Sequence, residues 1–158
     1  MCEPETLHVC ALYPDLMNIY ADRGNLLVLR RRCEWRGIHF QLRGSHIGDE
    51  LAPGWADLFY VGGGQDRDQR LCAEDLNTRK RDALRSAAAD GAVVLGVCGG
   101  YQLLGNEYEM DDIVLPGVGL LDIRTVRSVG DRLTGNIAIQ PELSGPDGQL
   151  LAGFENHA

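Results

Sequence analysis

An uninterrupted apolar segment, Ala92 to Val97, ends in a cysteine that is followed at once by two glycines. Because the segment is short and apolar on both faces, it predicts a buried strand of a parallel sheet. A helical pattern begins directly after it, so Cys98 would lie at the carboxyl end of the strand, where open α/β sheets bind their ligands. The segment therefore predicts a layered α/β fold with a site at Cys98.

The residues around Cys98 have the form of a nucleophile elbow with a thiol in place of the hydroxyl. In such a tight turn the positions two before and two after the nucleophile must be small, and here they are Gly96 and Gly100. Free N–H groups at the start of the following helix would favour the thiolate and could hold an oxyanion. The pattern alone leaves a second interpretation open, a buried structural cysteine, because free cysteines are among the most buried residues.

Composition narrows the class of protein. The 158 residues, 44% hydrophobic and 24% charged, suit one soluble globular domain. With a net charge of −8 and no basic stripe, the chain does not resemble a nucleic-acid-binding protein, and Arg30–Arg32 is interpreted as a solvated helix face. There is no apolar run long enough for a bilayer and no visible signal peptide, so we expect no membrane insertion. Five cysteines without a C-x-x-C pair indicate neither a disulfide framework nor a zinc site, and favour the cytoplasm.

The order of expected elements favours a flavodoxin-like open, mostly parallel sheet with helices on both faces. The apolar patterns predict strands at 7–12, 38–42, 57–61 and 92–97, and helices at 26–36 and 67–89, the latter divided near 77–78. After residue 108 the pattern changes to short strands, expected to be antiparallel, at 114–119, 123–126, 134–139 and 151–154.

Three successive glycines, Gly62–Gly64, come directly after the strand predicted at 57–61. Taken alone, a glycine triplet is also typical of a flexible turn. At the end of a central strand it exposes backbone N–H groups and permits close approach. Right-handed crossovers would place this loop and Cys98 at the same edge of the sheet. We therefore expect a loop of oxyanion donors beside the nucleophile.

Five motifs in order resemble the class I glutamine amidotransferases, in the branch that includes cobyric acid synthase, and most of all the GatD-type glutaminase subunits of that branch. The resemblance extends over almost the whole chain. The motifs are Tyr20–Asn25, Gly62–Arg67, Val97–Gln102, Arg132–Gly135 and Gly153–His157.

The resemblance implies a role for several residues. Cys98 would attack the side-chain amide of L-glutamine and form a γ-glutamyl thioester with release of ammonia. The N–H groups of Gly99 and of Gly63 or Gly64 would hold the oxyanion. The chain itself would need no cofactor or metal.

Two further side chains are assigned by the resemblance to substrate binding. Gln102 would line the glutamine pocket. Arg132 would hold the α-carboxylate of glutamine through two parallel hydrogen bonds. Without the resemblance, Arg132 would be interpreted as a solvated surface charge and Gln102 as an ordinary polar helix residue.

The implied partner is a Mur-ligase-like subunit of the MurT type, which would use ATP and amidate the D-glutamate of lipid II in peptidoglycan synthesis. One alternative keeps the glutaminase and changes the acceptor to a corrinoid or another small acid. Another is a non-catalytic flavodoxin-like or DJ-1-like binding module with a redox cysteine.

The family's catalytic histidine lies beyond the Gly153–His157 motif, and a general base must lie within hydrogen-bond reach of the thiol. None of His8, His39, His46 and His157 occupies a matching position. We therefore expect residues 1–158 to form a single class I amidotransferase domain that is truncated at its C-terminus and has little glutaminase activity alone.

Overall fold

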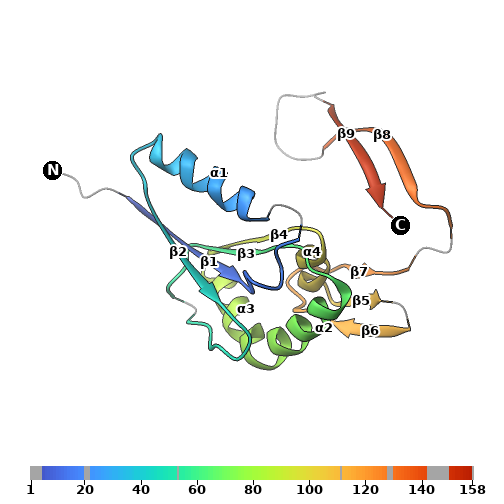
Figure 1. Ribbon diagram of the computed structural model, residues 1–158, viewed down its shortest axis with the longest axis horizontal. Helices are drawn as coiled ribbons and strands as arrows, with labels where there is room; N and C mark the ends of the chain where they lie inside the picture. The colour runs from blue at the N-terminus through green and yellow to red at the C-terminus, as the bar shows by residue number, and fades with distance from the viewer. Residues whose placement is uncertain are drawn as a thin grey trace. The chain divides into compact units, whose positions relative to one another are not determined.

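The computed structural model describes residues 5–19, 22–52, 54–110, 112–127, 130–141 and 150–157. The chain divides into two compact units, Met1–Thr125 and Val126–Ala158, and each is described by itself. The first unit contains a parallel sheet, its helices and a small mixed sheet, whereas the second contains a hairpin (Figure 1). That the chain forms a single amidotransferase domain stays a prediction.

The centre of the first unit is a four-stranded parallel sheet with the order β2-β1-β3-β4. The strands are β1 (Thr6–Leu12), β2 (His39–Ser45), β3 (Leu58–Val61) and β4 (Val93–Gly96). Strands β1, β3 and β4 end at the same level of the sheet: Leu12 pairs with Val61, and Val61 pairs with Gly96. The predicted parallel α/β fold is confirmed, and the loops that follow these strands meet at one edge.

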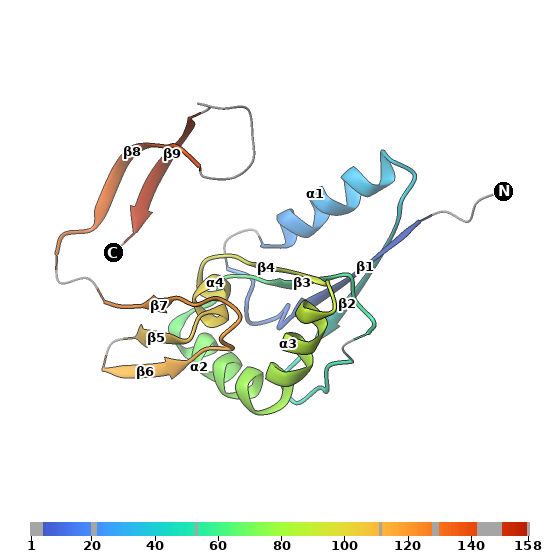
Figure 2. The same ribbon diagram turned by 180° about the vertical axis from the view of Figure 1, so that it is seen from behind.

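Helices cover both faces of this sheet (Figures 1 and 2). Helix α1 (Asp22–Glu34) lies on one face, and α2 (Asp66–Asp75), the π-helical turn η1 (Leu76–Lys80) and α3 (Arg81–Ala89) lie on the other. The chain moves in one direction across the sheet from β1 to β2 and in the other direction from β3 to β4. Because both crossover connections are right-handed, α1 lies on one face and the α2–α3 segment lies on the other. The core under α2 and α3 is fully buried and includes Phe59, Cys72, Leu76 and Leu84.

One helix boundary differs from the sequence prediction, and a second feature of the helices agrees with it. Helix α1 begins at Asp22, not Leu26, so Gly24 and Asn25 lie in its first turn. The Asp22 carboxylate is buried there and accepts a hydrogen bond from Tyr60, and a negative charge at a helix N-terminus is favourable. The predicted division of the second helical segment is confirmed, and the structure shows it as the π-helical turn η1.

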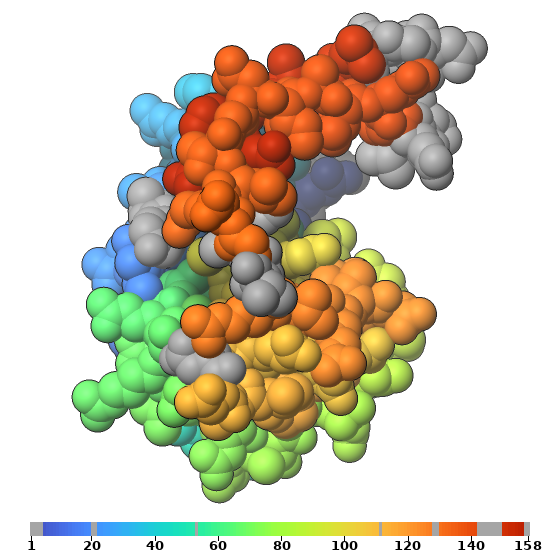
Figure 3. Space-filling model, turned by 90° about the vertical axis from the view of Figure 1, so that its right-hand side faces the viewer, coloured from blue at the N-terminus to red at the C-terminus, as the bar shows by residue number. Residues whose placement is uncertain are grey.

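A short helix and three short strands complete the first unit: α4 (Gly99–Leu104), β5 (Glu107–Met110), β6 (Ile113–Pro116) and β7 (Arg124–Thr125). Strands β5 and β6 are antiparallel, but β7 pairs with β5 in parallel, so the antiparallel prediction is wrong for β7. Strand β5 was not predicted as a separate strand. These yellow-to-orange strands lie beside the green helical segment (Figure 3), and Asn77 Nδ2 donates a hydrogen bond to the Pro116 carbonyl at 2.7 Å.

The second unit contains the antiparallel hairpin of β8 (Leu133–Ile139) and β9 (Leu151–His157). The pairing runs from Leu133 opposite His157 to Ile139 opposite Leu151. Both strands were predicted, and β9 extends three residues beyond the predicted end at residue 154. In the described part of the chain, the helices are too short or too polar to cross a bilayer.

Candidate active site

Cys98 lies in the turn between β4 and α4, at the carboxyl end of the sheet. Its φ of 54° and ψ of −121° are rarely adopted by an L-residue with a side chain, and such strain is concentrated at functional sites. The Cys98 side chain is exposed, whereas Cys10, Cys33 and Cys72 are all buried. The interpretation of Cys98 as a buried structural cysteine is therefore wrong.

The glycines around Cys98 leave no room for side chains. A Cβ atom at Gly96 would lie 2.8 Å from Leu104 Cδ1, and one at Gly100 would lie 2.7 Å from the Gly62 carbonyl oxygen. The Gly100 N–H donates to two carbonyl oxygens, those of Gly62 and Val97, each at 3.0 Å. The turn at Cys98 is thus in direct contact with the glycine loop, as the crossover argument predicted.

The glycine loop Gly62–Gly64 is buried and is bonded to the loop that follows β1. The Gly63 carbonyl accepts a hydrogen bond from the Ile19 N–H at 3.2 Å. The N–H groups of Gly63, Gly64 and Gly99 donate no hydrogen bond to any residue that the structure describes. The two adjoining segments therefore keep backbone donors available for a ligand.

A buried polar cluster at the start of α1 supports the glycine loop. A Cβ atom at Gly62 would lie 2.6 Å from Asp22 Cγ, and the Asp22 carboxylate accepts a hydrogen bond from the Tyr60 hydroxyl at 2.8 Å. Asn25 Nδ2 donates to the same hydroxyl at 2.8 Å. Burial raises the pKa of Tyr60 to about 12, so the phenol stays a donor to Asp22 at neutral pH. No role for this cluster was predicted from the sequence, although two of its members belong to the Tyr20–Asn25 motif.

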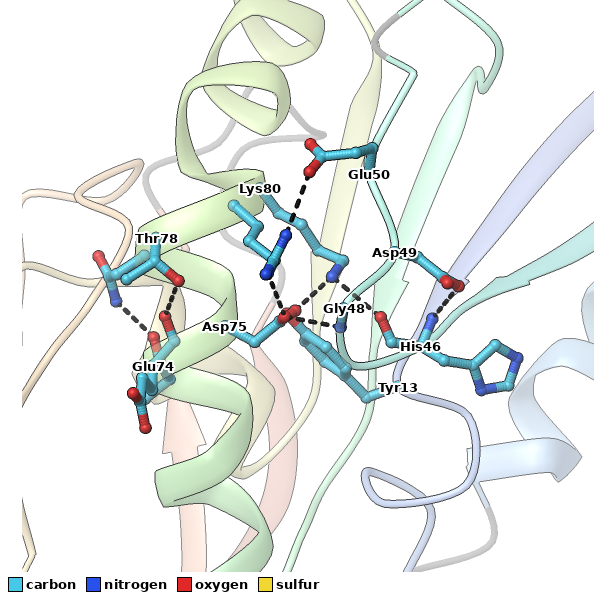
Figure 4. A network of polar contacts seen from close by, with 12 residues as sticks. Tyr13, His46, Gly48, Asp49, Glu50, Glu74, Asp75, Thr78 and Lys80 are labelled. Atoms are coloured by element: carbon cyan, nitrogen blue, oxygen red, sulfur yellow. Dashed lines mark hydrogen bonds and ion pairs between the residues drawn. The ribbon is translucent and has the colours of Figure 1, made fainter.

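A second buried network lies at the ends of β1 and β2 (Figure 4). Tyr13 also has a φ of 54°, and its hydroxyl donates to Asp75 Oδ2 at 2.8 Å. Lys80 Nζ donates to the same oxygen and, at 3.0 Å, to the His46 carbonyl. The Gly48 N–H donates to Asp75 Oδ1 at 2.8 Å. The network thus joins two loops at the carboxyl edge of the sheet to the π-helical turn.

The charges in this network are fixed by its hydrogen bonds. Burial by itself raises the pKa of Asp75, but the hydrogen bonds from Lys80, Gly48 and Tyr13 outweigh burial and lower it. Burial and the neighbouring Asp75 carboxylate raise the pKa of Tyr13. The loop that begins at Tyr13 packs against the glycine loop. A Cβ atom at Gly64 would lie 2.5 Å from Sδ of Met17, which belongs to the Tyr13 loop. The network therefore supports the candidate site indirectly.

The two predicted glutamine-binding side chains lie in different units. Gln102 is half-buried on α4, and its N–H donates to the Cys98 carbonyl at 3.3 Å. Arg132 belongs to the second unit and is exposed, with Nε 2.7 Å from Asn156 Oδ1 and Nη2 3.4 Å from the Asn156 carbonyl oxygen. The first unit therefore brings Cys98, the glycine donors and Gln102 together, whereas Arg132 is oriented by its own hairpin.

The three histidines of the first unit lie away from the Cys98 thiol. His8 and His39 lie near the amino ends of β1 and β2, whereas Cys98 follows the carboxyl end of β4. His46 follows the carboxyl end of β2, which is three strand positions away from β4. With neighbouring strands about 4.8 Å apart, that separation is roughly 14 Å. The side chain of His157 lies outside the described residues. In the described part of the chain, no three His, Cys, Asp or Glu side chains are placed to hold a metal ion.

Comparison with known protein families assigns the class. A family model of the CobB/CobQ-like glutamine amidotransferase domain matches residues 8–158. The chain belongs to this family. The predicted resemblance to the amidotransferase branch of cobyric acid synthase is confirmed.

Relatives of this CobB/CobQ-like domain carry two kinds of name. The lipid II isoglutaminyl synthase (glutamine-hydrolyzing) subunit GatD of Staphylococcus aureus (strain N315) is 37% identical over 155 residues, which cover 96% of this chain and 61% of that protein. GatD of Streptococcus pneumoniae (strain ATCC BAA-255 / R6) is 36% identical, with 98% and 58% covered. Cobyric acid synthase of Jannaschia sp. (strain CCS1) is 34% identical, with 68% and 23% covered. The chain thus spans about three-fifths of the length of these GatD relatives.

Proposed function

We propose that this chain is the glutaminase portion of a lipid II isoglutaminyl synthase. It hydrolyses L-glutamine and supplies ammonia to a Mur-ligase-like partner of the MurT type, which amidates the D-glutamate of lipid II. The observation that carries the proposal is the exposed Cys98 thiol on a strained strand-to-helix turn, in contact with a glycine loop whose Gly63 and Gly64 N–H groups have no partner among the described residues. The similarity to GatD over nearly the whole chain supports the choice of acceptor.

The proposed reaction is acyl transfer to sulfur. The Cys98 thiolate forms a C–S bond to the side-chain carbonyl carbon of glutamine, and the carbonyl electron pair moves onto oxygen. The N–H groups of Gly63, Gly64 and Gly99 stabilise this oxyanion. When the carbonyl re-forms, the C–N bond breaks and the nitrogen leaves as ammonia after receiving a proton. Water then hydrolyses the γ-glutamyl thioester to glutamate and the free thiol.

Substrate binding is assigned to Gln102 and Arg132. Gln102 lies one turn beyond Cys98 and would contact the substrate beside the reacting amide. The Arg132 guanidinium is already oriented by Asn156, so less side-chain freedom is lost when it binds the α-carboxylate. Both assignments are part of the proposal. ATP would be used by the partner ligase, and no cofactor is proposed for this chain.

The general base is proposed to be none of the four histidines, since His8, His39 and His46 are too distant and the resemblance places the family's catalytic histidine after the motif that contains His157. We therefore expect residues 1–158 to turn over glutamine far more slowly than a GatD relative assayed alongside. The measurement is ammonia release at saturating L-glutamine. Equal turnover would show that the base is present in this chain.

The test of the glutamine site is protection of the thiol, which requires no general base. Cys98 is alkylated with iodoacetamide, and the adduct is followed by peptide mass spectrometry, with Cys98→Ser to identify the peptide. L-glutamine at millimolar concentration should slow alkylation of Cys98 several-fold, and D-glutamine should not. Equal rates with and without L-glutamine would overturn the proposal and favour the non-catalytic binding module.

The acceptor is decided with the partner. Glutamine labelled with ¹⁵N in its side-chain amide is supplied together with ATP, the candidate Mur-ligase-like protein and lipid II. Label in the D-isoglutamine amide supports the proposal. Label that appears only when a corrinoid acid and its ligase are supplied would support the alternative, to which the more limited similarity with cobyric acid synthase points.

A further inference from the structure

Gln69, at the end of the first turn of α2, is a buried glutamine with an incomplete set of hydrogen bonds. Its side chain is 5% exposed, and Nε2 donates to the Gly64 carbonyl at 2.7 Å. Its Oε1 atom is buried and has no hydrogen-bond partner in the described part of the chain. A buried amide oxygen without a partner destabilises a fold, so its retention in a native structure requires an explanation.

The Gln69 carboxamide also lies against the residue that follows the proposed nucleophile. A Cβ atom at Gly99 would lie 2.6 Å from Gln69 Cδ, 2.7 Å from Nε2 and 2.8 Å from Oε1. Since all three atoms are almost equally distant, the flat face of the amide packs on the Gly99 Cα atom. The amide therefore lies between the two segments that hold the proposed oxyanion donors, the glycine loop and the start of α4.

Each carbonyl of the glycine loop is held by a different element. Those of Gly62 and Gly63 accept backbone N–H groups from Gly100 and Ile19, and that of Gly64 accepts the Gln69 side chain. The Gly64 N–H shares a peptide plane with the Gly63 carbonyl, so both peptide planes that flank Gly64 are anchored. Glycine rotates more freely than any other residue, and these two anchors remove that freedom.

We infer that Gln69 is a positioning residue that fixes the spacing between the Gly64 and Gly99 backbone donors. The inference rests on the proposed glutaminase function. The Gln69 amide restrains Gly64 through a hydrogen bond and fills the space beside Gly99, so that the donors are preorganised before substrate arrives. A hydrophobic side chain of similar shape would keep the packing and lose only the hydrogen bond. Stability and reactivity should therefore respond differently to that change.

The test compares two reagents on Gln69→Met and on the unchanged chain. A chloromethyl ketone analogue of glutamine first forms a thiohemiketal whose oxyanion needs the backbone donors, whereas iodoacetamide alkylates sulfur without forming an oxyanion. The assays are run at alkaline pH, where a thiol ionises without a base. The maximal rate of inactivation by the ketone should fall about 100-fold, with its half-saturation concentration changed less than threefold. The iodoacetamide rate should change less than twofold.

Control variants separate positioning from folding. Gln69→Glu has the same shape but an acceptor in place of the donor, and should lose reactivity as Gln69→Met does. Gln41→Met, at an exposed glutamine of β2, should change neither rate. The midpoint of urea unfolding of Gln69→Met should stay close to that of the unchanged chain, because the substitution removes the unpartnered Oε1 atom but leaves the Gly64 carbonyl oxygen without its donor. A ratio of the two reagent rates that is unchanged in Gln69→Met would overturn the inference.

Amide hydrogen exchange at Gly100 distinguishes failure of this inference from failure of the proposed function. This N–H joins the elbow to the glycine loop, so looser positioning in Gln69→Met should increase its exchange at least tenfold. If the unchanged chain does not react with the ketone, the glutaminase proposal fails, and Gly100 exchange alone decides whether Gln69 holds the two segments together. Unchanged exchange would then also overturn the inference.

Discussion

The chain leaves β1 at Tyr13 and β4 at Cys98, and both residues have a φ of 54° although neither is glycine. At Tyr13 the side chain is 1% exposed, and its hydroxyl is bonded to Asp75 in a network with Lys80. At Cys98 the side chain is exposed and has no hydrogen-bond partner in the described structure. A positive φ thus accompanies a buried, anchored ring at one strand end and an exposed thiol at the other.

The difference shows how a strained residue is stabilised. Strain of this kind persists only where the surrounding structure over-determines it. Tyr13 is stabilised through its own side chain, whereas Cys98 depends on its neighbours Gly96 and Gly100, which allow the turn to pack against the glycine loop. Changes around Tyr13 should therefore reduce stability most, and changes at Cys98 should alter reactivity with little loss of stability.

Among changes that remove a single polar group, the largest expected effect is that of removing the carboxylate that holds Tyr13. Asp75→Ala leaves the Lys80 ammonium, which is 0% exposed, buried without an opposite charge. The free energy of unfolding should fall by about 3–5 kcal/mol, measured by urea denaturation. The matched control is Asp82→Ala, at an exposed aspartate of α3, which should change it by less than about 0.5 kcal/mol. A small loss for Asp75→Ala would show that the network does not stabilise the β1 end.

A smaller loss is expected when the support of Cys98 is disturbed. Gly100→Ala would place a methyl group 2.7 Å from the Gly62 carbonyl oxygen, so the start of α4 must move away from the glycine loop. Overpacking of this kind costs about 1–3 kcal/mol, and urea denaturation measures it. Gly54→Ala is the control, because apart from its chain neighbours no described residue has an atom within 4 Å of the added Cβ. Equal midpoints for the two variants would contradict the close contact.

Substitution by glycine should change the free energy of unfolding in opposite directions at Cys98 and at Tyr13. Cys98→Gly relieves the backbone strain and should raise the free energy of unfolding by about 1 kcal/mol, once the greater freedom of glycine in the unfolded chain is subtracted. Cys98→Ala is the control, since it removes the sulfur but keeps the strain. Tyr13→Gly should instead lower stability, because the buried ring and its hydrogen bond are lost. Stabilisation by Tyr13→Gly would contradict the proposal that Tyr13 is held by its own side chain and Cys98 by its neighbours.

The smallest expected effect is a pH dependence of the unfolding midpoint, caused by Asp75, the hydrogen-bond partner of Tyr13. The pKa of Asp75 is lower in the folded chain than in the unfolded chain, so its contribution is fully present above the unfolded pKa of about 3.9. That contribution is lost as pH falls through the folded pKa. Below about pH 4 the unfolding midpoint of Asp75→Asn should therefore decline less steeply than that of the unchanged chain. Parallel acid profiles would show that Asp75 is not responsible, and Cys98→Ala should leave the profile unchanged.

The sequence determined the features that depend on neighbouring residues. The apolar segment before Cys98, the two glycines after it and the triplet Gly62–Gly64 predicted a parallel sheet with two loops at one edge, because strand patterns and crossover handedness act locally. The structure contains that arrangement. The exposure of Cys98 did not follow from the pattern, since a buried cysteine has the same neighbours in sequence.

Only the tertiary structure decided which polar side chains work together. Tyr13 and Asp75 are 62 residues apart, and the Asp75–Lys80 pair is joined through a π-helical turn where the sequence indicated only a division of the helix. Gln69 could not be distinguished from a solvated helix residue until its contacts with Gly64 and Gly99 were known. Hydrogen bonds in a buried region depend on which segments the fold brings together, and that information is spread over the whole chain.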